Sequence, residues 1–224
     1  MSSFTPITLD EFQERTGISR KELASVREDA VSVVSLRDIA RAESVQAMPR
    51  EYLEQLIANV TLAGDTTRKP YERLDIQMLR MDPGGLRVAQ TFVERPKYRG
   101  IVENVSDLFA GFCVSRGVAK RTASIVRGRT ADGTSVIAHY LPPIVEEQGG
   151  KFFLLDGTHR CFLIKAIGTT IETITVRGIT APFPCMEQEW SSLRIVDVKP
   201  PIAERFVDLR PELFRDLKFV GIDG

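Results

Sequence analysis

The sequence predicts a mixed α+β protein, and three observations lead to this prediction. Short runs rich in β-branched residues, such as residues 31–39, are typical of strands. Residues 82–85 (Asp-Pro-Gly-Gly) and 131–133 (Ala-Asp-Gly) interrupt such runs as hairpin turns do. Residues 49–64 carry apolar side chains on one helical face, which predicts an amphipathic helix.

The N-terminal residues predict two short helices in succession. Thr8 and Glu11 have capping-box spacing, and Gly17 is expected to end the first helix. A second helix is expected from Ser19 to about residue 28. The alternative is a helix-turn-helix, but Gln13 stands where that motif often has alanine. A helical hairpin that covers a sheet edge is therefore favoured.

The remaining elements follow in chain order. Pro49 is expected to open a helix that Gly64 closes. The turn at Gly149 and Gly150 leads into the next strand, and Glu146 and Glu147 are expected to be exposed charges before it. Further strands are expected at 73–81, 86–93, 124–129, 134–140, 152–155 and 171–176, and helices at 101–114, 159–167, 187–192 and 202–208.

Three segments are expected from this order of elements. Residues 1–30 form a helical extension and residues 31–180 the main domain. The main domain contains an inserted, basic, β-rich segment at about residues 66–130. Residues 181–224 are punctuated by prolines and form a helical tail packed on the domain.

Charge is balanced overall, with 30 basic and 30 acidic side chains, but it is unevenly distributed. Residues 66–130 carry 13 basic and 6 acidic side chains, a net charge of +7. Arg121, Arg127 and Arg129 in this region are candidates for contacts with a nucleotide or a nucleic-acid backbone. The alternative, weighted equally, is a loop region whose arginines pair with carboxylates elsewhere.

The composition argues against a zinc site and against a membrane protein. The three cysteines have no Cys-x-x-Cys spacing, and two histidines do not complete a zinc site. No run approaches membrane-spanning length, and no signal peptide is visible at the N-terminus. A cytoplasmic protein with no membrane partner is the expectation.

Residues 152–168 are the most informative stretch of the chain. A buried strand over 152–155 is followed by Asp156 and Gly157, and Thr158 is expected to cap the next helix. Free backbone N–H groups and a positive dipole end then meet at one point. Such a point is suited to hold an anionic group, most plausibly a phosphate.

Two parts of the chain together resemble the ParB/sulfiredoxin superfamily. Residues 33–39, the helix after Pro49 and its end at Gly64 resemble the opening of ParB N-terminal domains. Residues 141–168 resemble the family's core, with the signature Asp156-Gly-x-His-Arg160 inside it. The resemblance implies a mixed sheet with flanking helices. Sulfiredoxin's catalytic cysteine is replaced here by Thr158, which argues against that activity.

The resemblance also implies a ligand and the residues that hold it. ParB proteins bind CTP at this turn, and other members of the fold use adenine nucleotides, so ATP, ADP or CTP is the implied ligand. Its phosphates would contact the residues of the turn, which are Gly157, Thr158, His159 and Arg160.

Each polar residue of the turn has a functional and a structural interpretation. Arg160 at a helix N-terminus opposes the dipole unless an anion is present, or it forms an ion pair with Asp156. Asp156 could hold Mg²⁺ or accept a hydroxyl proton, or it could cap the turn. His159 could act as an acid or base near its usual pKa of about 6.5, or hydrogen-bond to the structure.

These observations lead to one functional hypothesis and one alternative. The leading hypothesis is a nucleotide-binding protein that hydrolyses the nucleotide or transfers its phosphoryl group to a small molecule. Asp156 and His159 would be its catalytic residues, with Mg²⁺ as a possible cofactor. The alternative is a DNA-binding or regulatory protein without turnover, in which the basic middle segment meets the nucleic acid.

Overall fold

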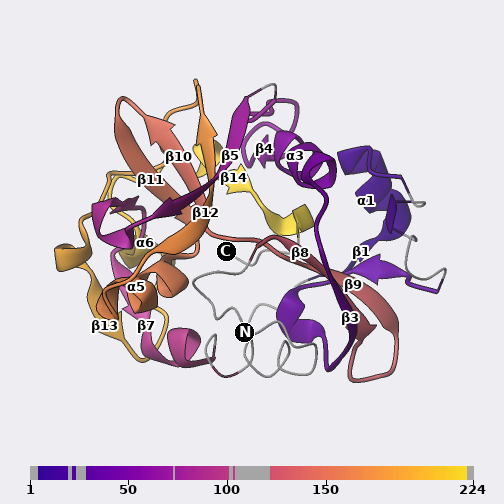
Figure 1. Ribbon diagram of the computed structural model, residues 1–224. Coiled ribbons are helices and arrows are strands. Elements are labelled where there is room, and N and C mark those ends of the chain that lie inside the picture. The colour runs from indigo at the N-terminus through magenta and orange to yellow at the C-terminus, as the bar shows by residue number, and fades with distance from the viewer. Residues whose placement is uncertain are drawn as a thin grey trace.

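The computed structural model describes residues 5–19, 22–23, 29–72, 74–100, 103 and 122–220. Two five-stranded sheets form its frame, and helix α3 (Arg50–Ala58) packs against both of them (Figure 1). The first sheet has the strand order β1-β2-β9-β8-β3, and the second has the order β5-β12-β10-β11-β6. Both sheets contain parallel and antiparallel pairs. The predicted mixed α+β class is therefore confirmed.

The first sheet is built around the predicted hairpin of β8 (Ser124–Arg129) and β9 (Ser135–Tyr140). Gly133 in its turn has a φ of 87°, which glycine adopts without strain. The other strands are β1 (Ile7–Thr8), β2 (Ser32–Val33) and β3 (Arg41–Ala47).

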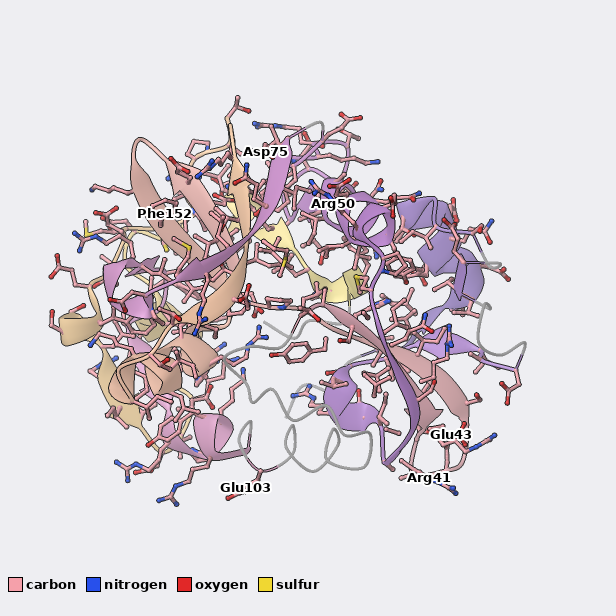
Figure 2. The ribbon with its side chains drawn as sticks, viewed as in Figure 1. Arg41, Glu43, Arg50, Asp75, Glu103 and Phe152 are labelled. Atoms are coloured by element: carbon pink, nitrogen blue, oxygen red, sulfur yellow. The ribbon has the colours of Figure 1, made fainter. Side chains whose placement is uncertain are left out.

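The strand expected over residues 31–39 is wrong beyond Val33. A 3₁₀ turn, η1 (Leu36–Asp38), follows, and the chain then enters β3, which the sequence did not predict. β3 lies at the end of the strand order and is mostly half-buried, so it needs no apolar run. Arg41 and Glu43 lie at its end away from α3 (Figure 2).

The second sheet contains the predicted hairpin of β10 (Ile144–Gln148) and β11 (Lys151–Asp156). Gly149 and Gly150 both have positive φ angles, 56° and 76°, as a two-residue hairpin loop requires. β12 (Ile171–Arg177) runs parallel to β10 and confirms the strand expected at 171–176.

The hairpin expected around residues 82–85 is wrong. β5 (Asp75–Met81) pairs with β12, whereas β6 (Arg87–Val88) pairs with β11 at the opposite edge of the same sheet. The Asp82 carboxylate accepts from the Gly84 amide at 2.8 Å and caps a 3₁₀ turn, η2 (Pro83–Gly85). This turn sends the chain across the sheet instead of back along β5. The chain then forms β7 (Phe92–Glu94), which pairs with β13 (Arg194–Val196).

The helices begin largely where the sequence predicts. In α1 (Leu9–Thr16) the Thr8 hydroxyl accepts from the Glu11 amide at 3.2 Å, and Gly17 ends the helix with a φ of 71°. Of the second N-terminal helix only Glu22 and Leu23 are described, and both are helical. Of the helix expected at 101–114, only Glu103 lies within the described residues. The remaining helical segments are α5 (Thr158–Ala166), α6 (Ile202–Arg205), η4 (Trp190–Ser192), η5 (Pro211–Leu213) and η6 (Lys218–Val220).

α3 ends at Asn59, five residues before the glycine expected to close it. Gly64 instead allows a close approach, because a Cβ placed there would lie 2.4 Å from the Cβ of Glu212. At this place β4 (Thr61–Leu62) pairs with β14 (Arg215–Asp216). The C-terminal segment is thereby attached to the chain that follows α3.

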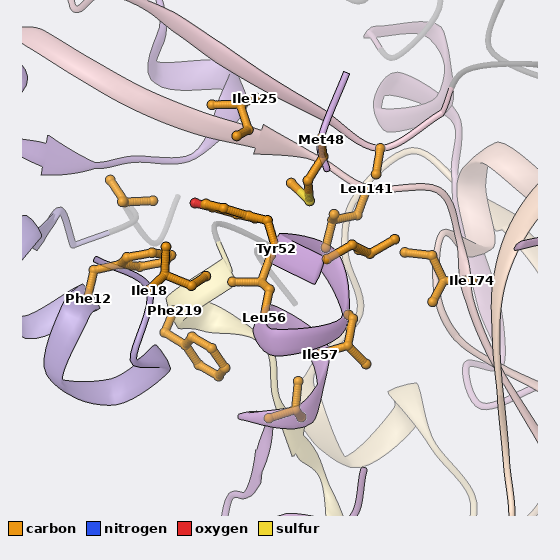
Figure 3. Close-up of a cluster of buried hydrophobic side chains, with 14 of the residues drawn as sticks. Phe12, Ile18, Met48, Tyr52, Leu56, Ile57, Ile125, Leu141, Ile174 and Phe219 are labelled. Carbon is orange, nitrogen blue, oxygen red and sulfur yellow. The ribbon is translucent and has the colours of Figure 1, made fainter. Parts of the chain in front are cut away.

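One central core joins the two sheets. Side chains of α3, α1, both sheets and the C-terminal segment meet in it, as Figure 3 shows. Tyr52, Leu56 and Ile57 of α3 lie between Ile125 of the first sheet and Ile174 of the second. Burial of apolar surface from five separate segments is what holds the sheets in place. A second, smaller cluster packs α5 against the other side of the second sheet through Cys161 and Ile164.

A fully buried ion pair fixes the C-terminal segment to the second sheet. The Arg215 guanidinium donates to both carboxylate oxygens of Glu146, at 2.8 and 2.9 Å, and also to the carbonyls of Ala181 and Pro182. The Tyr71 hydroxyl donates to the same carboxylate at 2.6 Å. The expectation that Glu146 is an exposed charge is therefore wrong: its side chain is 0% exposed and that of Arg215 is 1% exposed.

Glu147 and Arg177 form an ion pair next to this buried one, and here both side chains are partly exposed. The two neighbouring glutamates point to opposite faces of β10, because side chains alternate along a strand. Only one of the two pairs is thus removed from water. Within the part of the chain that is described, no helix is long and apolar enough to cross a membrane.

We expect Arg215→Met to lower the free energy of unfolding by about 3–5 kcal/mol, because it leaves the Glu146 carboxylate buried without its cation. Arg177→Met is the matched control, and its partly exposed pair should contribute no more than about 1 kcal/mol. Urea unfolding of both variants measures the difference. Equal losses in the two variants would contradict the importance of the buried pair.

Candidate functional site

The predicted strand–glycine–helix turn is present between β11 and α5. Gly157 has a φ of 94° and is the N-cap of α5, with no side-chain cap. The expectation that Thr158 caps the helix is wrong, because Thr158 is already its first helical residue and is buried. The first helical hydrogen bond runs from the Cys161 amide to the Gly157 carbonyl at 2.9 Å. The amides of residues 158–160 therefore belong to the positive end of the helix.

Glycine is required at position 157 for two reasons. Its left-handed backbone is strained for other residues, and a Cβ there would lie 2.8 Å from the Pro143 ring. The connection between β9 and β10 is thus packed directly on the turn. This contact fixes the start of α5 relative to both sheets.

Arg160 has internal partners on three sides. Its Nη2 donates to the Asp156 carboxylate at 2.7 Å, and its Nη1 donates to the Leu141 carbonyl. The guanidinium also lies 5.6 Å from the centre of the Tyr140 ring. Burial opposes its charge, but the Asp156 carboxylate and the Tyr140 side chain raise the pKa of Arg160 above its usual value. The ion-pair interpretation of Arg160 is the one that the structure confirms.

The same contacts decide the position of Asp156. Its side chain is 20% exposed, against 13% for Arg160, so the pair is mostly buried but keeps some contact with solvent. Leu141 and Tyr140 come from the end of β9, whereas Asp156 ends β11. Arg160 therefore ties the first sheet to the second.

His159 has a structural contact instead of a free ring. Its Nε2 accepts from the Glu94 amide at 3.0 Å, and the side chain is buried. Burial first, and then nearby positive charges, lower the pKa of His159 to about 3. His159 therefore does not have the pKa near 6.5 that the sequence analysis assumed for an acid or base. At neutral pH His159 is a neutral acceptor.

The positive charges near His159 are a feature that the sequence analysis missed. Lys97 and Lys199 act on its ring together with Arg160. Lys97 lies in the helical residues 95–100, and Lys199 lies between β13 and α6. Both lysines are half-buried. They are 62 and 40 positions from His159 in the sequence, so only the folded chain brings them to the start of α5.

Of the arginines proposed for contacts with a nucleic acid, the two that the structure describes have partners within the fold. Arg127 is 3% exposed and donates to the Leu23 carbonyl at 2.8 Å. Arg129 pairs with Glu43 at 3.0 Å and with Asp29 at 3.6 Å. Arg129 fits the alternative of pairing with carboxylates, which the sequence left open, whereas Arg127 is buried and bonded to a backbone carbonyl. Arg121 lies outside the described residues.

Arg127 has an unusual environment among the described residues. Its Nε and Nη1 have no hydrogen-bond partner there, and burial lowers its pKa from the usual value. An arginine stays charged even so, and a buried charge without a carboxylate destabilises the fold.

A metal centre finds no support in the described residues, where no group of three or more His, Cys, Asp or Glu side chains converges. Asp156 is the carboxylate at the turn, and Arg160 already occupies one of its oxygens. Mg²⁺ is often held by one carboxylate together with substrate phosphates, and only that mode fits these residues.

No family model matches the chain, and searches of curated proteins and of solved structures find no match. The ParB/sulfiredoxin resemblance therefore stays a prediction that rests on the residues of the turn and on the opening segment.

We expect His159 to make stability depend on pH. The folded pKa, about 3, lies below the unfolded value of about 6.5, so the unfolded chain takes up the proton first as the pH falls. The stabilisation that the neutral His159 ring contributes to the folded state is complete above pH 6.5. It is lost between pH 6.5 and pH 3, and the loss reaches about 4 kcal/mol at pH 3.

His159→Gln tests this, because the glutamine carbonyl can still accept from the Glu94 amide but does not titrate. Thermal unfolding from pH 7 to pH 4 should show a smaller loss in the variant. A loss identical to that of the native chain would show that other groups cause the acid sensitivity.

We expect Arg127→Met to raise the free energy of unfolding by about 1 kcal/mol, because it replaces a buried cation, which has no carboxylate partner among the described residues, by an apolar side chain. Arg129→Met, at an arginine with two carboxylate partners, should lower it by up to about 1 kcal/mol. Urea unfolding compares the two. Destabilisation by Arg127→Met beyond that of Arg129→Met would contradict this account of Arg127.

Proposed function

We propose that this chain binds the phosphate groups of a nucleotide at the start of α5. The proposal is supported most by the start of α5, where the amides of residues 158–160 precede the first helical hydrogen bond, and by Lys97 and Lys199, whose positive charges act on His159 in that first turn. Amides at a helix N-terminus donate to phosphate oxygens, and the helix dipole favours an anion there. The lysines add two positive charges from segments outside the motif.

The residue roles in this proposal differ from those first expected. Gly157 gives the turn its left-handed backbone, and the amides of Thr158, His159 and Arg160 are the donors. The buried side chains of Thr158 and His159 hold the start of the helix in position. Lys97 and Lys199, instead of the side chains of Thr158 and His159, are the proposed side-chain contacts with the phosphates.

The reaction that we propose is hydrolysis of the nucleotide or transfer of its phosphoryl group to a small molecule. Such reactions depend mostly on positioning and on stabilising the charge of the phosphates. Asp156 is the proposed carboxylate for Mg²⁺ or for a hydroxyl proton, since His159 is neutral and already engaged. Binding of DNA, the second function considered, has no described residue in its favour.

We expect ATP, ADP or CTP to bind the native protein, with affinity that falls as salt is added, because screening weakens contacts with partly exposed lysines. Lys97→Ala and Lys199→Ala should each weaken binding about fivefold, equivalent to about 1 kcal/mol. Isothermal titration measures both effects.

Lys165→Ala is the matched control, since Lys165 is an exposed lysine in the last turn of the same helix. Its loss should change affinity less than twofold, because the dipole and charge effects act within one helical turn. If none of the three nucleotides binds, or if Lys165→Ala weakens binding as much as Lys97→Ala, the proposed site is wrong.

A further inference from the structure

The Asp156–Arg160 pair combines two features that are usually separate. It is an ion pair in close contact, at 2.7 Å, and it stands at the helix end where the proposed function places a phosphate. The Asp156 carboxylate lies one residue before the N-cap of α5, where a negative charge is favoured by the helix dipole. The protein thus already supplies an anionic partner at this end of the helix.

We propose that Asp156 is an internal competitor for the phosphate: its carboxylate holds the Arg160 guanidinium until a phosphate oxygen replaces it. The inference rests on the proposed function and adds a regulatory contact to the same site. Carboxylate and phosphate oxygens both accept charge-assisted hydrogen bonds from a guanidinium. A phosphate oxygen can therefore take the place of the carboxylate oxygen on Nη2.

The geometry of Arg160 supports an exchange of this kind. Its Nη1 is fixed by the Leu141 carbonyl, and its plane lies near the Tyr140 ring, so two contacts from β9 hold the guanidinium without Asp156. Asp156, in contrast, is held at the partly exposed side. The contact that would be exchanged is one charge-assisted hydrogen bond from Nη2 to the Asp156 carboxylate, and a phosphate oxygen can accept the same kind of bond.

The inference predicts that removing the carboxylate strengthens binding. A ligand that must first displace an internal partner has its affinity reduced by the fraction of free guanidinium. Asp156→Asn keeps the shape of the side chain and removes its charge. In the absence of divalent cations, we expect it to tighten binding of ADP about fivefold to tenfold.

Two further variants separate this effect from a general change of charge. Glu94→Gln removes a negative charge from the residue whose amide contacts His159, and it should change ADP affinity less than twofold. Arg160→Ala should remove the effect, so that Asp156→Asn in the Arg160→Ala background leaves ADP affinity unchanged. Titration calorimetry in EDTA, with folding checked by circular dichroism, measures all four proteins. Asp156→Ser serves as a second carboxylate-free variant if Asp156→Asn does not fold.

The outcomes distinguish this inference from the proposed function. If the native protein binds ADP and Asp156→Asn binds it equally or more weakly, Asp156 does not compete with phosphate and the inference is wrong. If Glu94→Gln tightens binding as much as Asp156→Asn, the effect is one of overall charge, and the inference is also wrong. If neither the native protein nor any variant binds ADP, the proposed function is wrong for ADP, and the inference is wrong as well.

Discussion

The ion pair between Glu146 and Arg215 is the constraint on which the arrangement of this protein most depends. Glu146 lies in β10, the middle strand of the second sheet, and Arg215 lies in the C-terminal segment that pairs with the chain after α3. Both side chains are withdrawn from water, so each needs the other and neither can be replaced alone. The pair thereby fixes Arg215 of the C-terminal segment opposite Glu146 of β10.

The site at the start of α5 uses the same chemistry under different conditions. Arg160 and Asp156 also form a close ion pair, but they do so at the partly exposed end of a helix. The difference in exposure changes what the pair can do. A pair that is 0–1% exposed stays closed because its opening would bury two bare charges. A pair that is 13–20% exposed keeps some contact with water, and the proposed exchange of the Asp156 carboxylate for a phosphate oxygen rests on this difference.

The sequence predicts the local elements of the fold well and their pairing poorly. The cap at Thr8, the hairpins around Gly133 and around Gly149, and the turn at Gly157 all follow from neighbouring residues. Turn and cap chemistry acts over a few residues and can be read directly. The edge strand β3 was missed because a half-buried strand carries no apolar run, and β5 and β6 were paired wrongly because no local signal records which edge a strand occupies.

In the candidate site, too, the sequence predicts local features but not contacts between distant segments. The sequence identified Gly157, and it left Arg160 between an ion pair and a phosphate contact. It could not identify the Glu94 amide as the partner of His159, nor Lys97 and Lys199 as neighbouring charges. Contacts of this kind join segments separated by 40 to 65 positions, and the fold alone brings them together.

The most direct test of the account is a crystal structure of the protein soaked with tungstate, a heavy analogue of phosphate. The account predicts tungstate oxygens within hydrogen-bond distance of the amides of residues 158–160, and one of them in place of the Asp156 carboxylate on the Arg160 guanidinium. Tungstate bound only elsewhere, with Arg160 still on Asp156, would contradict it.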